Sequence, residues 1–100
     1  MDNFYNDLGN IVHTRIKVYT DYYTTNAHST RIVTISLSDL GLKNSNFILF
    51  SFIVCTSTNS LLDARNYNIW SDSSHSFKII TLNSSDLTQD IPIICYTLYR

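Results

Sequence analysis

The residues best suited to binding chemistry gather in one polar stretch, which reads D-Y-Y-T-T-N-A-H over positions 21–28. Its aromatic, amide and imidazole side chains belong to Tyr22, Tyr23, Asn26 and His28. Aromatic rings stack on the weakly apolar faces of sugar rings, while amide and imidazole groups exchange hydrogen bonds with pairs of hydroxyls. The stretch therefore predicts a loop that binds a saccharide. The alternative is an ordinary polar loop whose tyrosines fold back onto the core.

A second stretch with useful side chains reads D-A-R-N-Y-N-I-W-S-D over positions 63–72. It holds the only tryptophan of the chain, Trp70, which could serve as a platform for a sugar ring. The alternative makes Trp70 a core residue or an anchor between subunits, which is the more common role of such a ring. We expect Asp63 and Arg65, from the same or an adjacent chain, to complete the saccharide site of the first stretch.

Catalysis and metal binding find no support in the sequence. The chain has no G-x-S-x-G, P-loop or H-E-x-x-H motif, which would position a nucleophile, a phosphate or a zinc ion. The three histidines, His13, His28 and His75, lack the two-residue spacing that places a pair of ligands on one face of a strand. We therefore predict that the protein is not an enzyme and has no catalytic residue, no metal site and no cofactor.

The charge of the chain and the length of its apolar runs exclude further classes. A formal net charge of -1 gives no electrostatic reason to bind nucleic acid or an anionic membrane. The apolar run over 46–55 is shorter than the ~20 residues that a helix needs to cross a bilayer. We therefore predict no nucleic-acid partner and no membrane insertion.

The two cysteines, Cys55 and Cys95, both lie in apolar runs. Residues 1–10 contain Asp2 and Asp7 and no apolar leader segment, so we expect the protein to be made and folded in a cytosol. Cytosolic cysteines are normally reduced, which predicts two buried free thiols. A disulfide would require the two cysteines to lie on neighbouring strands.

Short runs of apolar or alternating residues, separated by turn residues, predict an antiparallel all-β domain. The six expected strands cover residues 11–20, 31–37, 47–55, 65–71, 76–82 and 91–99. The segments expected to be loops or turns are 21–30, 38–42, 56–64 and 83–90. The predicted organisation is an N-terminal arm over 1–10 and a six-stranded antiparallel β-sandwich over 11–100.

The third of these strands is unusual because it is apolar on both faces. Residues 46–55 read N-F-I-L-F-S-F-I-V-C, in which only Asn46 and Ser51 are polar. A strand with one buried face and one solvent-exposed face should instead alternate apolar and polar residues. Something must cover its second face, and neighbouring subunits are the favoured explanation. The alternative is a central strand whose outer face is shielded by loops.

Three segments carry a resemblance to a known family, namely R-I-V-T-I-S-L-S-D-L-G-L (31–42), S-F-K-I-I-T-L-N (76–83) and I-I-C-Y-T-L-Y (93–99). The order of these segments and the pattern of residues within them resemble the H-type lectin-like domains of snail agglutinins, discoidins and phage tail fibre tips. In that family the penultimate strand carries F-x-V or F-x-I, matched here by Phe77 and Ile79. An aromatic residue follows near the end of the final strand, where the family usually has Trp and this chain has Tyr96 or Tyr99.

The resemblance implies a six-stranded sandwich that assembles as a homotrimer and recognises a host-surface saccharide. The chain would then be the tip domain of a phage or viral fibre, found in the virion or outside the cell after assembly in the cytoplasm. The alternative is a structural trimerisation or virion assembly domain without a ligand. A lectin should hold a concave, aromatic-lined site at the loops 20–30 and 56–64 or between chains, whereas a structural domain should not.

Overall fold

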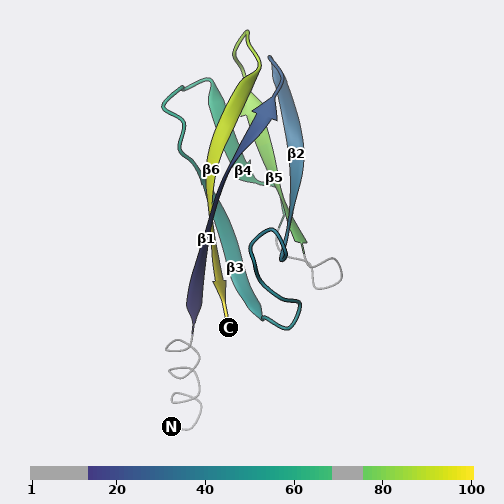
Figure 1. Ribbon diagram of the computed structural model, residues 1–100. Coiled ribbons are helices and arrows are strands. Elements are labelled where there is room, and N and C mark those ends of the chain that lie inside the picture. Colours follow the sequence, from purple (N-terminus) through teal and green to yellow (C-terminus); the bar gives the residue numbers. More distant parts are fainter. Residues whose placement is uncertain (1–13, 69–75) are drawn as a thin grey trace.

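Six strands form two three-stranded antiparallel sheets in the computed structural model, which describes residues 14–68 and 76–100 (Figure 1). Sheet A has the strand order β1-β6-β3, and sheet B has the order β2-β5-β4. The prediction of six antiparallel strands in an all-β architecture is confirmed. No helix in the described ranges is long and apolar enough to cross a membrane. The strands are β1 Arg15–Thr25, β2 Ser29–Ser36, β3 Ile48–Cys55, β4 Leu62–Asn66, β5 Ser76–Asn83 and β6 Gln89–Tyr99.

The core lies between the two sheets and follows the alternation of the strands. Ile91, Ile93 and Cys95 on β6 are fully buried, and so are Phe77 and Ile79 on β5. They form one apolar cluster with buried residues of the other strands. Because successive side chains of a strand point to opposite faces, every second residue of a strand points toward the core. The alternation of residues 31–37 predicts that Val33 and Ile35 face inward, and both are buried.

The segment between β2 and β3 adds leucines to this core. Leu37 and Leu40 are buried, and Leu42 packs against the same cluster. The backbone N–H of Ser36 donates to Asp39 Oδ2 at 2.9 Å, which holds the start of the turn. Gly41 has a φ of 72°, a left-handed conformation that glycine adopts without the strain a side chain would cause. Figure 1 shows this segment looping beside β3 before the chain enters that strand.

The segment predicted as a polar loop over 21–30 is mostly strand. β1 continues to Thr25 and β2 begins at Ser29, so only three residues separate them. Tyr23 pairs with Ile91 in the ladder to β6, and Tyr23 and Thr25 are both buried. Aromatic and β-branched residues fit a pleated, half-buried surface well, and here their pairing outweighs the polar composition of the stretch.

The fourth strand lies earlier in the chain than predicted. β4 begins at Leu62, inside the segment expected to be a loop, and ends at Asn66. Leu62 and Ala64 are buried, which anchors the strand to the core. The remainder of the predicted strand from 69 onwards, including Trp70, lies outside the described residues, as does the N-terminal arm over 1–10.

β3 is apolar on both faces, as its sequence indicates, and the two faces have different surroundings. Ile53 packs against the core, whereas Phe50, Phe52 and Val54 point away from it and are exposed. β1 alternates as well, but the face that carries Ile16 and Val18 is the exposed one. Sheet A therefore has a second apolar face that the described chain leaves uncovered.

The two cysteines lie on neighbouring strands and are free thiols. In the register of β3 with β6, Cys55 lies opposite Ile93 and Cys95 lies opposite Ile53. The cysteines are therefore diagonal neighbours, which are ~7–8 Å apart, beyond the ~4.4–6.8 Å between the Cα atoms of a disulfide. Burial raises the pKa of the Cys95 thiol.

Candidate functional site

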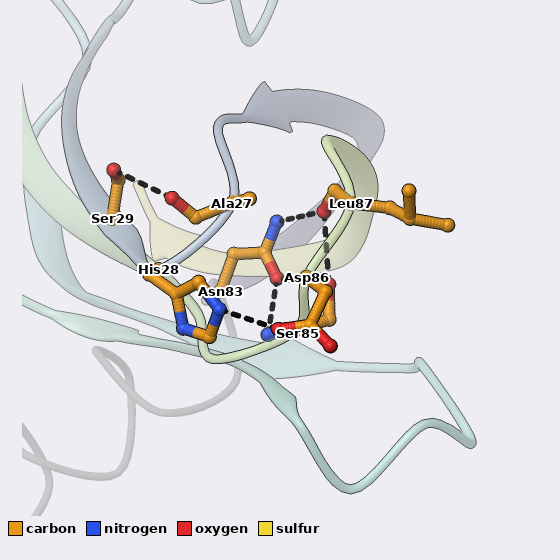
Figure 2. A network of polar contacts seen from close by, with 7 residues as sticks. All are labelled: Ala27, His28, Ser29, Asn83, Ser85, Asp86 and Leu87. Atoms are coloured by element: carbon orange, nitrogen blue, oxygen red, sulfur yellow. Dashed lines mark hydrogen bonds and ion pairs between the residues drawn. The ribbon is translucent and has the colours of Figure 1, made fainter.

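Two turns meet at one end of the sandwich, and the side chain of Asn83 joins them (Figure 2). Asn83 is buried, and its Nδ2 donates to the carbonyl oxygens of Thr25 at 2.8 Å and Leu87 at 2.9 Å. Its Oδ1 accepts from the backbone N–H of Ser85 at 2.9 Å and from Ser85 Oγ at 2.6 Å. These bonds use both amide hydrogens and both lone pairs. The two turns are thus fixed relative to each other.

His28 extends the same connection to the surface. Its backbone N–H donates to the carbonyl of Ser85 at 3.2 Å, and its Nε2 lies 2.6 Å from Asp86 Oδ1. The residue has a φ of 52°, which is uncommon for a residue with a side chain and is typical of a tight turn. Both side chains of the pair are exposed. An imidazole and a carboxylate are therefore held in place at the surface, where they can reach a ligand.

A shallow hollow of about 570 Å³ lies beside this network. Its lining comes from the end of β5, the start of β2 and the turns that follow or precede them: His28, Ser29, Thr30, Leu82, Asn83 and Ser84. Thr30 is exposed and Leu82 is half-buried, on the outer face of sheet B. The hollow therefore combines an apolar side chain with hydroxyl and imidazole groups on a rigid part of the fold.

The predicted residues Asp63 and Arg65 lie on the same face of sheet B. Asp63 pairs with Leu82 in the ladder, and Leu82 pairs with Thr30, so one row of side chains runs from β4 to the hollow. Arg65 Nε donates to Asp63 Oδ2 at 2.9 Å, and this exposed ion pair stands at the end of the row. The structure thus places His28, Asp63 and Arg65 along one surface, although they come from two different parts of the sequence.

The aromatic part of the predicted site does not lie with this polar part. Tyr23 faces the core and is only 9% exposed, with the Arg31 guanidinium 5.9 Å from the centre of its ring. Tyr22 points the other way and is exposed on the outer face of sheet A. Consecutive residues of a strand face opposite sides, so the two rings cannot line one site. Asn26 is exposed in the three-residue turn between β1 and β2, and Trp70 lies outside the described residues.

Sequence reasoning overlooked the residues that β5 and the following turn contribute to the hollow. Leu82, Asn83 and Ser84 come from a segment expected to be an ordinary strand end and loop. The cluster of Asn, Ser and Asp over 83–86 was a signal for a tight turn with side chains bonded to the backbone. The meeting of this turn with the one at His28 depends on the sandwich topology, which the sequence pattern does not specify.

The arrangement is suited to hydrogen bonding rather than to metal coordination. Within residues 14–68 and 76–100, no group of three His, Cys, Asp or Glu residues lies close enough to hold a metal ion. In the same ranges every buried side-chain nitrogen or oxygen has a hydrogen-bond partner. The polar groups that line the hollow are hydroxyls, an amide and an imidazole, which bond well to a ligand rich in hydroxyls. The carboxylate and guanidinium of Asp63 and Arg65 lie outside this lining, along the row from β4.

No protein-family model, curated protein or solved structure matches the chain. The resemblance to H-type lectin-like domains remains a prediction made from the strand segments.

Proposed function

We propose that the chain is a non-enzymatic binding module that recognises a saccharide on a host surface. The observation that carries the proposal is the hollow at the turn end of sheet B, where Leu82 is surrounded by polar groups on a rigid support. Binding residues commonly lie on turns that a sheet holds in position. In keeping with the resemblance, the module would be an H-type lectin-like sandwich at the tip of a phage or viral fibre, exposed outside the cell after assembly.

The chemistry of the hollow favours a neutral sugar over other ligands. A sugar ring presents many hydroxyls and only a small apolar face, so it needs several fixed donors and acceptors around a modest apolar contact. His28, Thr30 and Ser84 provide such groups beside Leu82 in the hollow. The Asp63–Arg65 pair adds further ones next to it, since Asp63 pairs with Leu82 in the ladder. A shallow site of this kind binds each sugar weakly. An oligomer, which the resemblance predicts to be a homotrimer, would raise the apparent affinity by presenting several sites together.

The test uses two matched substitutions on one face of β2. Thr30 and Thr34 are both exposed, but only Thr30 lines the hollow. We expect Thr30→Lys to reduce binding to glycan-displaying host cells or a glycan array at least about tenfold, because the longer side chain fills a shallow site. Thr34→Lys should bind as strongly as the unsubstituted protein, which we call the parent. Equal binding by both variants would show that the hollow is not the site.

A structural role without a ligand is the second candidate, and it is favoured by the apolar face of sheet A, which residues 14–68 and 76–100 leave uncovered. Under this reading the chain is a trimerisation or virion assembly domain, and the polar network around Asn83 only stabilises the turns. A glycan array on the assembled protein separates the two candidates. A parent protein that assembles but binds no glycan would support the structural role and contradict the lectin.

A further inference from the structure

The outer face of sheet A forms one continuous apolar surface, which we call the apolar face. Val18, Tyr96 and Phe52 form one row across its three strands, as the ladder registers show. The Phe52 ring stacks on Tyr96 with 5.1 Å between their centres, and on Phe50 with 6.0 Å. The outward apolar side chains of the face are Ile16, Val18 and Tyr22 of β1, Pro92, Ile94, Tyr96 and Leu98 of β6, and Phe50, Phe52 and Val54 of β3.

The exposed area of this face is large for a chain of this size. Ile16 is 63% exposed, Val18 53%, Tyr22 69% and Phe50 51%. Phe52 is 38% exposed and Val54 44%. Since aromatic side chains offer about 150–250 Å² each and aliphatic ones somewhat less, the six fractions give an apolar area of roughly 450–700 Å². The largest apolar patch of an ordinary monomer is about 300–600 Å². A stable interface buries about 800 Å² on each partner. The face is therefore close to one half of a stable interface.

The placement of charge on the face shows which occupant fits. Along β6 the outward side chains from Pro92 to Leu98 are uncharged, while Asp90 precedes them and Arg100 follows them. Asp90 accepts a hydrogen bond from Thr24 Oγ1 at 2.5 Å, and the Arg100 guanidinium lies 4.7 Å from the centre of the Phe47 ring. The face thus has an acid at one end, a base at the other and an apolar centre. If a second copy is placed on the face in the reverse direction, the acid of each copy lies opposite the base of the other, and the two apolar centres meet.

We propose that a second copy of this chain packs on the apolar face, sheet against sheet, with the β6 strands antiparallel. The two-fold axis would run between the two sheets, perpendicular to the β6 strands. It would place Asp90 of each copy near Arg100 of the other. Two sheets packed in this way lie ~10 Å apart and bury their facing side chains. The hollow lies on sheet B, so it remains open in the pair. The inference stands independently of the saccharide proposal.

The first experiment measures the oligomeric state by light scattering at micromolar concentration. The parent should be a dimer. Phe52→Lys places a charge at the centre of the face and should give a folded monomer, because an unpaired charge is costly in an apolar interface. The matched control is Ile32→Lys, since Ile32 is 52% exposed on the outer face of sheet B. It should remain a dimer. A monomeric parent, or equal behaviour of the two variants, would overturn the inference.

The second experiment tests the antiparallel arrangement by reversing the charges at the two ends. Asp90→Arg and Arg100→Asp should each weaken dimerisation about two- to tenfold, and the double variant should restore it. A double variant that is as weak as the single variants would contradict the end-to-end pairing. A trimeric parent would also overturn the two-fold pair, while supporting the assembly that the lectin resemblance predicts.

Discussion

Asn83 is the residue on which the candidate site depends most, although it is buried. Its amide bonds to Thr25, Ser85 and Leu87, and thereby fixes two turns that are far apart in sequence. A buried amide that is removed leaves its former partners without hydrogen bonds, and each such group costs about 1–3 kcal/mol. The cost of losing Asn83 should therefore be large for a single side chain of its size.

We expect Asn83→Ala to lower the free energy of unfolding by about 2–4 kcal/mol, since the Thr25 carbonyl and the Ser85 N–H lose their bonds to the amide. The Leu87 carbonyl still accepts from Ser85 Oγ at 2.9 Å. Asn26→Ala is the matched control, because Asn26 is an exposed amide in the adjacent turn and should change stability by less than about 0.5 kcal/mol. Urea unfolding followed by circular dichroism measures both. Equal stability of the two variants would show that the network does not hold the turns.

Two tyrosines on the inner side of β1 make the stability depend on alkaline pH. Burial, followed by the hydrogen bond to Asp21, raises the pKa of Tyr19, whose hydroxyl donates to Asp21 Oδ2 at 2.7 Å. Burial also raises the pKa of Tyr23. In the unfolded chain a tyrosine releases its proton near pH 10. The folded state holds these protons more tightly, so their stabilising effect is complete below about pH 10 and is lost as the pH rises further.

We therefore expect the free energy of unfolding to fall from about pH 8.5, where the thiol of Cys95 ionises in the unfolded chain, and to fall more steeply above about pH 10, where the tyrosines do. Tyr19→Phe cannot ionise at this position, so the fall should be less steep than in the parent. Tyr22→Phe is the control, because Tyr22 is exposed on the outer face. Denaturant unfolding at a series of pH values measures the slopes. A Tyr19→Phe variant with the slope of the parent would contradict the assignment.

At the scale of the strands, alternation predicts that Val33 and Ile35 of β2 face inward, and the structure buries both. It separates the two faces of β5 without choosing between them, because Ile80 and Leu82 make the outer face partly apolar as well. It could not orient β1, which carries Ile16 and Val18 on one face and Tyr19 and Tyr23 on the other. The pairing of β1 with β6 decides that question, and such long-range pairing is not visible in a local pattern.

The same limit explains how much of the site was predicted. The polar residues His28, Asp63 and Arg65 were recognised by type, and the topology of sheet B then placed them on one surface. The predicted grouping of Tyr22 with Tyr23 assumed a loop, in which neighbouring side chains can converge. In a strand they diverge. The strand in question extends to Thr25 because its residues pair with the start of β6, some 65 positions later in the chain.

For the whole molecule, the two sheets have different roles in the proposals. The apolar face of sheet A accounts for assembly, and the polar outer face of sheet B carries the hollow. A pair joined through sheet A presents two hollows on opposite outer surfaces, so each can meet a ligand. This separation allows assembly and binding to be altered one at a time.

The last prediction uses this separation. Phe52→Lys should bind a soluble single sugar as strongly as the parent does, because Phe52 lies on the sheet opposite the hollow. Beads densely coated with that sugar, however, should be agglutinated by the parent and not by the variant, since the two hollows of a pair face opposite sides and can each hold a different bead. The turbidity of a suspension of coated beads measures the difference, with Thr34→Lys as the matched control that retains both assembly and binding. Equal agglutination by the parent and Phe52→Lys would mean that assembly through sheet A does not support recognition through sheet B.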